Sequence, residues 1–165
     1  MSSRQYQGVT LIELCVGMAL VAVVAGLAAP GFRSSLRAAA LRTGTYELLG
    51  SLHQTRTNSI VESQPGTLCP SDVAGNCLPP GAPAEYWSTS LDSADGPAPH
   101  DSHALPAGVV VRASRSPLRF WPDSLAASTG TLTICDVQGL AAPRAIVLSK
   151  SGRARVATAA ESACS

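Results

Sequence analysis

Residues 9–29 read VTLIELCVGMALVAVVAGLAA, an apolar run that begins directly after Gly8 and ends before Pro30. A run of about 20 apolar residues is long enough to cross a bilayer as a helix. Glu13 is its only strongly polar member, and an ionisable side chain within a membrane span indicates a functional site. The run is longer than the apolar part of a secretory signal, and no suitable small-residue cleavage site follows it. The stretch therefore predicts a membrane helix that is retained.

The helical pattern resumes after Pro30 and continues to about Ser63. Pro30 should bend the helix, and Pro65-Gly66 should end it. Cations such as Arg37 and Arg56 fall on the face opposite the apolar one. We therefore expect a membrane-spanning part at 9–29 and an amphipathic continuation at 30–63. The apolar face of the continuation, read at helical spacing, comprises Leu36, Ala40, Leu41, Leu48, Leu49, Leu52 and Ile60.

Residues 64–165 are expected to form a globular, β-rich domain. Their first part, 66–108, is rich in Pro, Gly, Ser and Asp, which predicts mostly loops with short strands near 67–69 and 86–90. Ser151-Gly152 marks a tight hairpin. The predicted fold class is α+β, a long N-terminal helix packed on an antiparallel β-sheet. Clearer β-rich runs lie at 109–113, 118–121, 130–137, 144–149 and 153–158.

The charge of the chain is small in total but unevenly distributed. The 165 residues carry a formal net charge of +1, with 14% charged and 45% apolar residues. This composition excludes a disordered charged tail and a coiled coil. Residues 43–108 sum to −6, whereas residues 109–156 sum to +5. Such a split is either an ordinary solvated face or a surface that binds polyanions.

Four of the five cysteines lie in the expected globular domain. Cys69 and Cys77 bracket a short loop, Cys135 lies in a predicted strand, and Cys164 is the penultimate residue. Four cysteines allow three pairings. We favour Cys69–Cys77, because it is local, and Cys135–Cys164, because it would hold the C-terminus. A zinc site is the alternative, but the spacing and the absence of a nearby His make it a poor one.

The sequence contains no convincing catalytic arrangement. A nucleophile elbow, a P-loop and a dinucleotide-binding glycine motif are all missing. His100 and His103 could be imagined as a metal pair, but their Pro- and Ser-rich surroundings favour a solvated loop. We therefore expect no catalytic residues, no metal and no cofactor, and an enzyme, including a membrane-anchored periplasmic one, is not the favoured reading.

The segment 144–156 is the strongest candidate for ligand binding. It carries Arg144, Lys150, Arg153 and Arg155 around the predicted hairpin. Side chains alternate along a strand, so Arg153 and Arg155 should point the same way. Paired guanidinium groups suit phosphate oxygens, and Gly152 allows a close backbone approach. The pattern predicts sequence-independent, salt-sensitive binding to a phosphate backbone, the alternative being a solvated hairpin.

The N-terminal motif resembles the cleavage site of type IV pilins and pseudopilins. The resemblance implies that a prepilin peptidase removes residues 1–8 after Gly8 and methylates the new terminus. Glu13 stands at the fifth position after the cut, although Val9 replaces the usual Phe or Met. In this family the glutamate pairs with the terminal amine of a neighbouring subunit, here that of Val9. The implied location is the inner membrane, with the globular domain in the periplasm, and then a pilus fibre at the cell surface.

The soluble part is similar to the GspH/FimT group of minor pilins. The similarity rests on Leu68-Cys69-Pro70-Ser71 with Cys77 and Trp87, Arg119-Phe120-Trp121-Pro122-Asp123, Gly130–Cys135 and Ser149–Arg155. In FimT-type members a G-R-x-R motif is associated with DNA binding during natural transformation, and Gly152, Arg153 and Arg155 occupy it. The resemblance implies DNA, other major and minor pilins and prepilin peptidase as partners. The alternative is a structural minor pilin that primes pilus assembly, or a type II secretion minor pseudopilin, without DNA binding.

Overall fold

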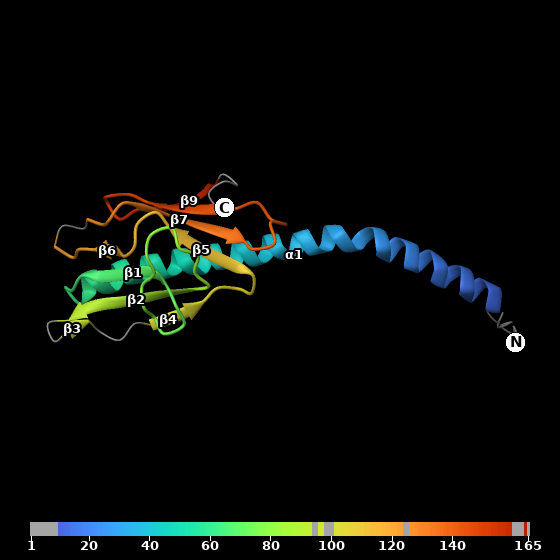
Figure 1. Cartoon of the computed structure of the whole chain (residues 1–165), viewed down its shortest axis with the longest axis horizontal. Coiled ribbons are helices and arrows are strands. Elements are labelled where there is room, and N and C mark those ends of the chain that lie inside the picture. Colours follow the sequence, from blue (N-terminus) through green and yellow to red (C-terminus); the bar gives the residue numbers. More distant parts are fainter. Residues whose placement is uncertain (1–9, 94–95, 98–100, 124–125, 160–163, 165) are drawn as a thin grey trace, which may run out of the picture.

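A long helix and two antiparallel sheets make up the protein (Figure 1). The computed structural model describes residues 10–93, 96–97, 101–123, 126–159 and 164. Helix α1 spans Leu11–Val61. Thr10 caps its start, because the Thr10 hydroxyl accepts a hydrogen bond from the Glu13 backbone N–H. The helix ends before Pro65, as the sequence predicts. At 1.5 Å per residue it is about 77 Å long.

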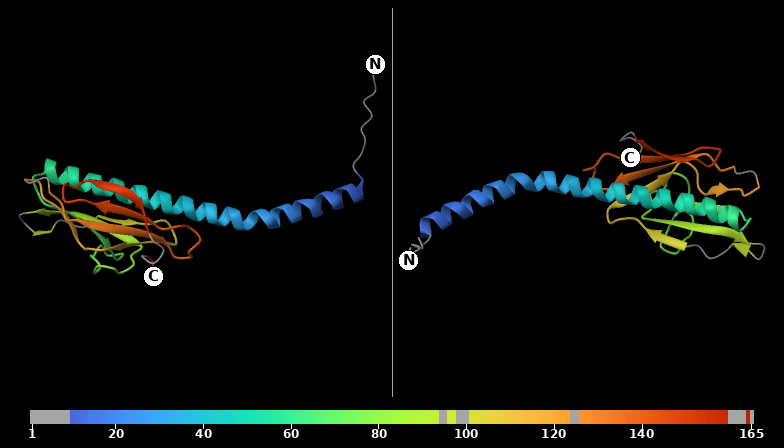
Figure 2. Two further views of the ribbon diagram at one scale, coloured as in Figure 1. Left: turned by 90° about the horizontal axis from the view of Figure 1, so that it is seen from above. Right: turned by 180° about the vertical axis from the view of Figure 1, so that it is seen from behind.

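The first half of α1 projects from the globular part as a stalk (Figure 2). The stretches Leu11–Gly26 and Gly31–Val61 make an angle of 44°. The bend falls between them, in the segment that contains Pro30, where the sequence predicts it. Among the described residues no single straight helix has the length and hydropathy of a membrane span, whereas this bent pair has both when taken together.

The strands form two sheets rather than the single sheet that the sequence suggests. One sheet has the order β3-β2-β1-β6, and β4 pairs with the same edge of β2 as β3. The other has the order β5-β7-β8-β9, and every pairing in both sheets is antiparallel. The strands are β1 Gly66–Ser71, β2 Tyr86–Ser93, β3 Gly96–Pro97, β4 Asp101–Ala104, β5 Val109–Ala113, β6 Leu118–Phe120, β7 Gly130–Asp136, β8 Arg144–Leu148 and β9 Ala154–Thr158.

The second half of α1 packs against both sheets and completes one hydrophobic core. Its buried stripe includes polar residues, and it differs from the predicted face, because Leu36 and Ile60 are exposed. Thr45 and Thr55 are buried at low cost, since each hydroxyl donates to a carbonyl one turn earlier, at 2.6 and 2.7 Å. The helix residues buried in this stripe are Leu41, Gly44, Thr45, Leu48, Leu52, Thr55 and Ser59.

The segment 66–108 contains more regular structure than predicted. His103 belongs to β4 rather than to a solvated loop, and its ring stacks on Trp87 with centroids 5.4 Å apart. His100 lies outside the described residues. The disulfides are Cys69–Cys77 and Cys135–Cys164, the pairing favoured from the sequence. The second ties the end of the chain to β7.

Candidate nucleic-acid interface

The basic hairpin joins β8 to β9 through a turn that its own hydrogen bonds define. The Gly152 N–H donates to the Ser149 carbonyl at 2.9 Å, and the Ser149 N–H donates to the Arg153 carbonyl at 3.0 Å. Gly152 has φ +72°, the left-handed conformation that a three-residue hairpin loop requires at this position. The Ser149 hydroxyl also accepts from the Arg153 N–H, at 3.2 Å. The glycine of the motif is therefore explained by the turn itself.

Two neighbouring segments hold this turn in place. The Arg56 guanidinium, from α1, donates to the Gly152 carbonyl at 3.2 Å. The Ala127 N–H, from the β6–β7 connection, donates to the Lys150 carbonyl at 2.8 Å. Sequence reasoning placed Arg56 on the solvent side of the helix, whereas it is half-buried beneath the hairpin. Its cationic character gave no hint of this role, because only the tertiary fold brings the two segments together.

Lys150 and Arg153, in this turn, and Arg155, the second residue of β9, have exposed side chains. Arg155 pairs with Val147 across the ladder, on the sheet face opposite the buried Ile146 and Leu148. Within the part of the chain that the structure describes, no carboxylate oxygen lies within ion-pair distance of these three cations. We call Lys150, Arg153 and Arg155 the basic turn.

Arg144 is not part of the basic turn, contrary to the sequence-based grouping. It pairs with Thr158 at the opposite end of β8, four residues from Leu148. That separation is about 14 Å at the strand rise. Arg144 also has the same alternation as Ile146, so it lies on the other sheet face from Arg155. Closeness in sequence therefore does not place Arg144 near the basic turn.

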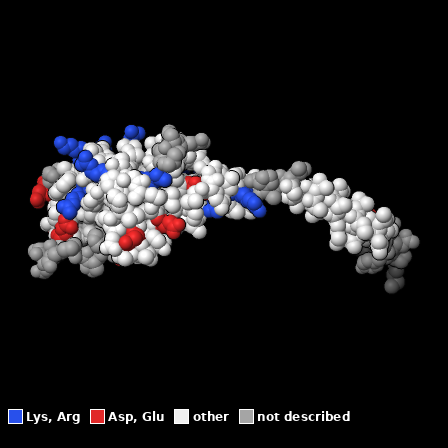
Figure 3. All heavy atoms as spheres, viewed as in Figure 1, with Lys and Arg blue, Asp and Glu red and all other residues white. Residues whose placement is uncertain are grey.

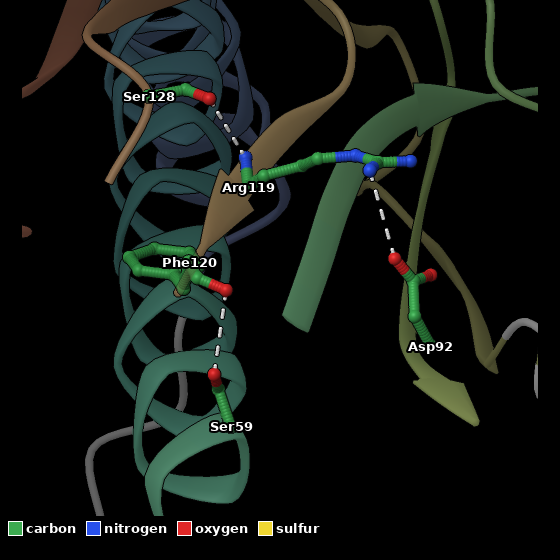
Figure 4. A network of polar contacts seen from close by, with 5 residues as sticks. All are labelled: Ser59, Asp92, Arg119, Phe120 and Ser128. Atoms are coloured by element: carbon green, nitrogen blue, oxygen red, sulfur yellow. Dashed lines mark hydrogen bonds and ion pairs between the residues drawn. The ribbon is translucent and has the colours of Figure 1, made fainter. Parts of the chain in front are cut away.

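The other cations of the positively charged segment 109–156 lie outside the basic turn. Arg119 lies on β6, in the other sheet, and its guanidinium is 3.7 Å from the Asp92 carboxylate on β2 (Figure 4). The Arg119 backbone N–H donates to the Ser128 hydroxyl. Arg112, on β5, donates to the Gly81 carbonyl at 3.4 Å. Arg115 is exposed in the β5–β6 connection.

The charge asymmetry of the sequence becomes a spatial one in the fold. On the face shown in Figure 3, Lys and Arg side chains of the globular part lie mostly toward the β8–β9 side. Asp and Glu side chains lie mostly toward the side of β2 and β4. A polyanion approaching this face would be attracted to the first side and repelled by the second.

Of the predicted processing and assembly residues, Glu13 is described: it is in the first turn of α1, at the free end of the stalk, and is exposed. Gly8 and Val9 are outside the described residues. Cys15 is a free, exposed cysteine. Among the described residues, no group of three or more His, Cys, Asp or Glu side chains could hold a metal ion.

Comparisons with known proteins agree with this architecture. The family model of the type II transport protein GspH matches residues 45–152, and that of the prokaryotic N-terminal methylation motif matches residues 3–29. The first match stops at Gly152, so it does not include Arg153 and Arg155. None of the curated proteins matches the sequence.

Two solved structures are similar in fold. The type IV minor pilin FimU of Pseudomonas aeruginosa has 18% identity and a TM-score of 0.51, over 74% of this chain and 90% of that one. The minor pseudopilin EpsH of the type 2 secretion system of Vibrio cholerae has 11% identity and a TM-score of 0.54, over 72% of this chain and 96% of that one.

Proposed function

The chain belongs to the family of the type II transport protein GspH, and we propose that it is a type IV minor pilin that captures extracellular DNA during natural transformation. The coarser assignment follows from the family itself. The protein is a type IV minor pilin or a type II pseudopilin, with a prepilin-like methylation motif, and not an enzyme. DNA binding by the basic turn is the finer step proposed here.

The observation that carries the proposal is the preorganisation of the basic turn. Its backbone is fixed by Arg56, by Ala127 and by the Ser149 hydroxyl, while its three cationic side chains stay exposed. Ordering a loop on binding costs free energy, and a turn that is already ordered avoids that cost. Arg56 lies 25 residues beyond Gly31, so the turn stands about 38 Å along α1 from the stalk. This position leaves it accessible when the stalk is held in a membrane or a filament.

The cations of the basic turn suit the phosphate backbone rather than the bases. Arg153 and Arg155 are two residues apart, so their Cα atoms are about 7 Å apart along the chain. Each guanidinium can bind phosphate oxygens in bidentate fashion. Binding of this type is independent of sequence, and each phosphate contact contributes about 0.9 to the slope of log affinity against log salt for duplex DNA.

Processing and assembly follow the same proposal. Prepilin peptidase cuts after Gly8, and residues 9–29 cross the inner membrane once, with the globular part in the periplasm. In the filament, the Glu13 carboxylate pairs with the amine of Val9 from a neighbouring subunit. Pairing offsets the cost of a charge in an apolar filament core. Major and minor pilins are therefore the protein partners.

A second candidate is a structural subunit without DNA binding. The similarity to EpsH and the family description both favour a secretion pseudopilin. A structural minor pilin that primes pilus assembly belongs to the same class. Neither role requires exposed arginines at positions 153 and 155, so these two residues distinguish the candidates.

A DNA titration of the globular fragment 31–165 tests the proposal. This fragment retains every core residue of the described chain, since the buried core begins at Leu41. We expect the wild type to bind duplex DNA and Arg153→Ala/Arg155→Ala to lose about 1.8 from the salt slope, or 0.9 for each contact. Arg119→Ala is the matched control, because this cation lies on the other sheet beside Asp92. A fragment that does not bind DNA, or a double variant with an unchanged slope, would refute DNA capture by the basic turn.

A further inference from the structure

A second cationic surface lies at the opposite end of the globular part, where the stalk leaves it. A groove of about 490 Å³ there is lined by residues of α1 and of the β7–β8 connection, namely Arg33, Leu36, Arg37, Ala40, Gln138 and Leu140. Leu36 and Leu140 are 54% and 47% exposed, and Phe32 and Val137 are 65% exposed. Phe32 is one helical turn before Leu36 and Val137 adjoins Gln138, so both extend the apolar area. We call Phe32, Arg33, Leu36, Arg37, Val137 and Leu140 the stalk-base surface.

The stalk-base surface stands at the height of lipid headgroups when residues 9–29 fill the bilayer core. Arg33 is four residues beyond Ala29, which is about 6 Å along the helix, and Arg37 is about 12 Å beyond it. The 44° angle of α1 reduces the height of Arg37 to about 9 Å. The headgroup region of each leaflet is about 5–8 Å thick, so Arg33 lies within it and Arg37 lies at its outer edge. Cations and apolar tips at this height are typical of segments that rest on a membrane surface.

Hydrogen bonds hold the β7–β8 connection in this position. The two Asp136 carboxylate oxygens accept the N–H groups of Gln138 and Leu140, at 3.2 and 2.9 Å. The Val137 N–H donates to the Gly108 carbonyl at 3.0 Å. The Arg37 guanidinium donates to the Ala107 carbonyl at 2.9 Å, which ties α1 to the same end of the domain. Figure 1 shows β7 ending toward the stalk. The exposed apolar side chains are thus presented by a fixed loop.

We propose that the stalk-base surface docks on the anionic phospholipids of the bilayer that anchors the stalk. Arg33 binds lipid phosphate, while Phe32, Leu36, Val137 and Leu140 enter the headgroup region. Docking fixes the orientation of the globular part before the subunit enters a filament. The occupant is a lipid surface because the stalk-base surface lies at the domain end of α1, the same helix whose exposed apolar side chains at residues 11–24 are suited to the bilayer core. The inference rests on the membrane anchoring given under the proposed function, and it is independent of DNA binding.

Depth-dependent quenching of a tryptophan reporter tests the docking. The full chain is reconstituted in nanodiscs of phosphatidylcholine alone or of equal phosphatidylcholine and phosphatidylglycerol, with a nitroxide lipid labelled at headgroup depth. The reporter is Leu140→Trp in a Trp121→Phe chain, where the remaining Trp87 is buried. Val137→Trp is a second reporter. Val61→Trp is the matched control, because Val61 is exposed and lies 24 residues beyond Arg37 on α1, about 36 Å away.

We expect quenching of both loop reporters, stronger with phosphatidylglycerol, and little quenching of Val61→Trp. Arg33→Gln should lower the ratio of docked to undocked protein about five-fold, because one cation near an anionic surface contributes about 1 kcal/mol to the binding free energy. Arg42→Gln, an exposed cation outside the groove, should leave the ratio unchanged. Equal quenching at positions 140 and 61 in nanodisc-bound protein would overturn the docking alone. Loop contacts seen only in assembled filaments would assign the surface to a neighbouring subunit instead. A chain that fails to co-migrate with nanodiscs would overturn the anchoring as well.

Discussion

Replacing Gly152 by alanine should destabilise the fold at the basic turn and lower its affinity for DNA, although Arg153 and Arg155 remain. An L-residue at φ +72° is strained by about 1–2 kcal/mol. Part of this cost is offset, because alanine lowers the conformational entropy of the unfolded chain relative to glycine. The added Cβ would also lie 3.1 Å from Arg56 Nε and 3.2 Å from Arg56 Cζ. Arg56 must then shift, which weakens its hydrogen bond to the Gly152 carbonyl by about 1 kcal/mol. We expect Gly152→Ala to lower the free energy of unfolding by about 2 kcal/mol.

Gly139→Ala separates the two causes. Gly139 has φ +66°, but no atom lies within 4 Å of the position of its added Cβ. It should therefore cost only the backbone strain, about 1 kcal/mol. Urea unfolding of fragment 31–165 measures both variants, and repeating them in an Arg56→Ala background completes a double-mutant cycle. The extra cost at Gly152 should disappear in that background, and DNA affinity should fall for Gly152→Ala but not for Gly139→Ala. Equal costs at the two glycines, or an extra cost that persists without Arg56, would refute the reasoning.

Four further predictions concern the rest of the chain. Glu13→Ala should abolish incorporation into filaments while the melting of fragment 31–165 is untouched, and normal incorporation in a filament pull-down would contradict the pairing role. Removing residues 1–30 should give a soluble monomer by sedimentation, because the exposed apolar stalk goes with them; an obligate oligomer would count against a stalk that is separate from the core. Cys135→Ser/Cys164→Ser should cost about 3.6 kcal/mol of stability in urea and Cys69→Ser/Cys77→Ser about 2.5 kcal/mol, because the larger loop constrains the unfolded chain more; the reverse order would contradict this. Hydrogen bonds from Asn76 hold the pKa of the Asp72 carboxyl below its usual value. The stability that the Asp72 carboxylate contributes is therefore present at neutral pH and is lost as the pH falls below the ordinary carboxyl range. Asp72→Asn should flatten the acid dependence of the urea midpoint, and an unchanged profile would show that Asp72 makes no such contribution.

The sequence predicted the strands that are rich in β-branched and apolar residues and missed those that are not. The runs at 109–113 and 130–137 were found because they are β-rich and are bounded by turn residues. Strand β4, Asp101–Ala104, has only exposed side chains, so its polar composition looks like a loop. Alternation also assigns faces without assigning partners. For that reason the division of the strands into two sheets could not be predicted.

The candidate site was predicted where it is local and missed where it depends on packing. Gly152, Arg153 and Arg155 lie at one end of the β8–β9 hairpin, and their spacing alone indicates a common surface. Arg144 was grouped with them, but the structure places it at the other end of β8. Closeness in sequence says little across the length of a strand. Arg56 was missed because 96 residues separate it from Gly152. A contact at that separation leaves no periodic signal in a single sequence.

Uptake of labelled DNA by piliated cells tests the central claim most directly. A strain that carries this gene with Arg153→Ala/Arg155→Ala is compared with wild type and with Arg119→Ala, and uptake is scored only for cells that display pili. The basic turn predicts that the double variant still assembles pili but loses DNA uptake, whereas Arg119→Ala retains it. Normal uptake in the piliated double variant would contradict DNA capture by the basic turn and leave a structural pilin or pseudopilin as the function of the chain.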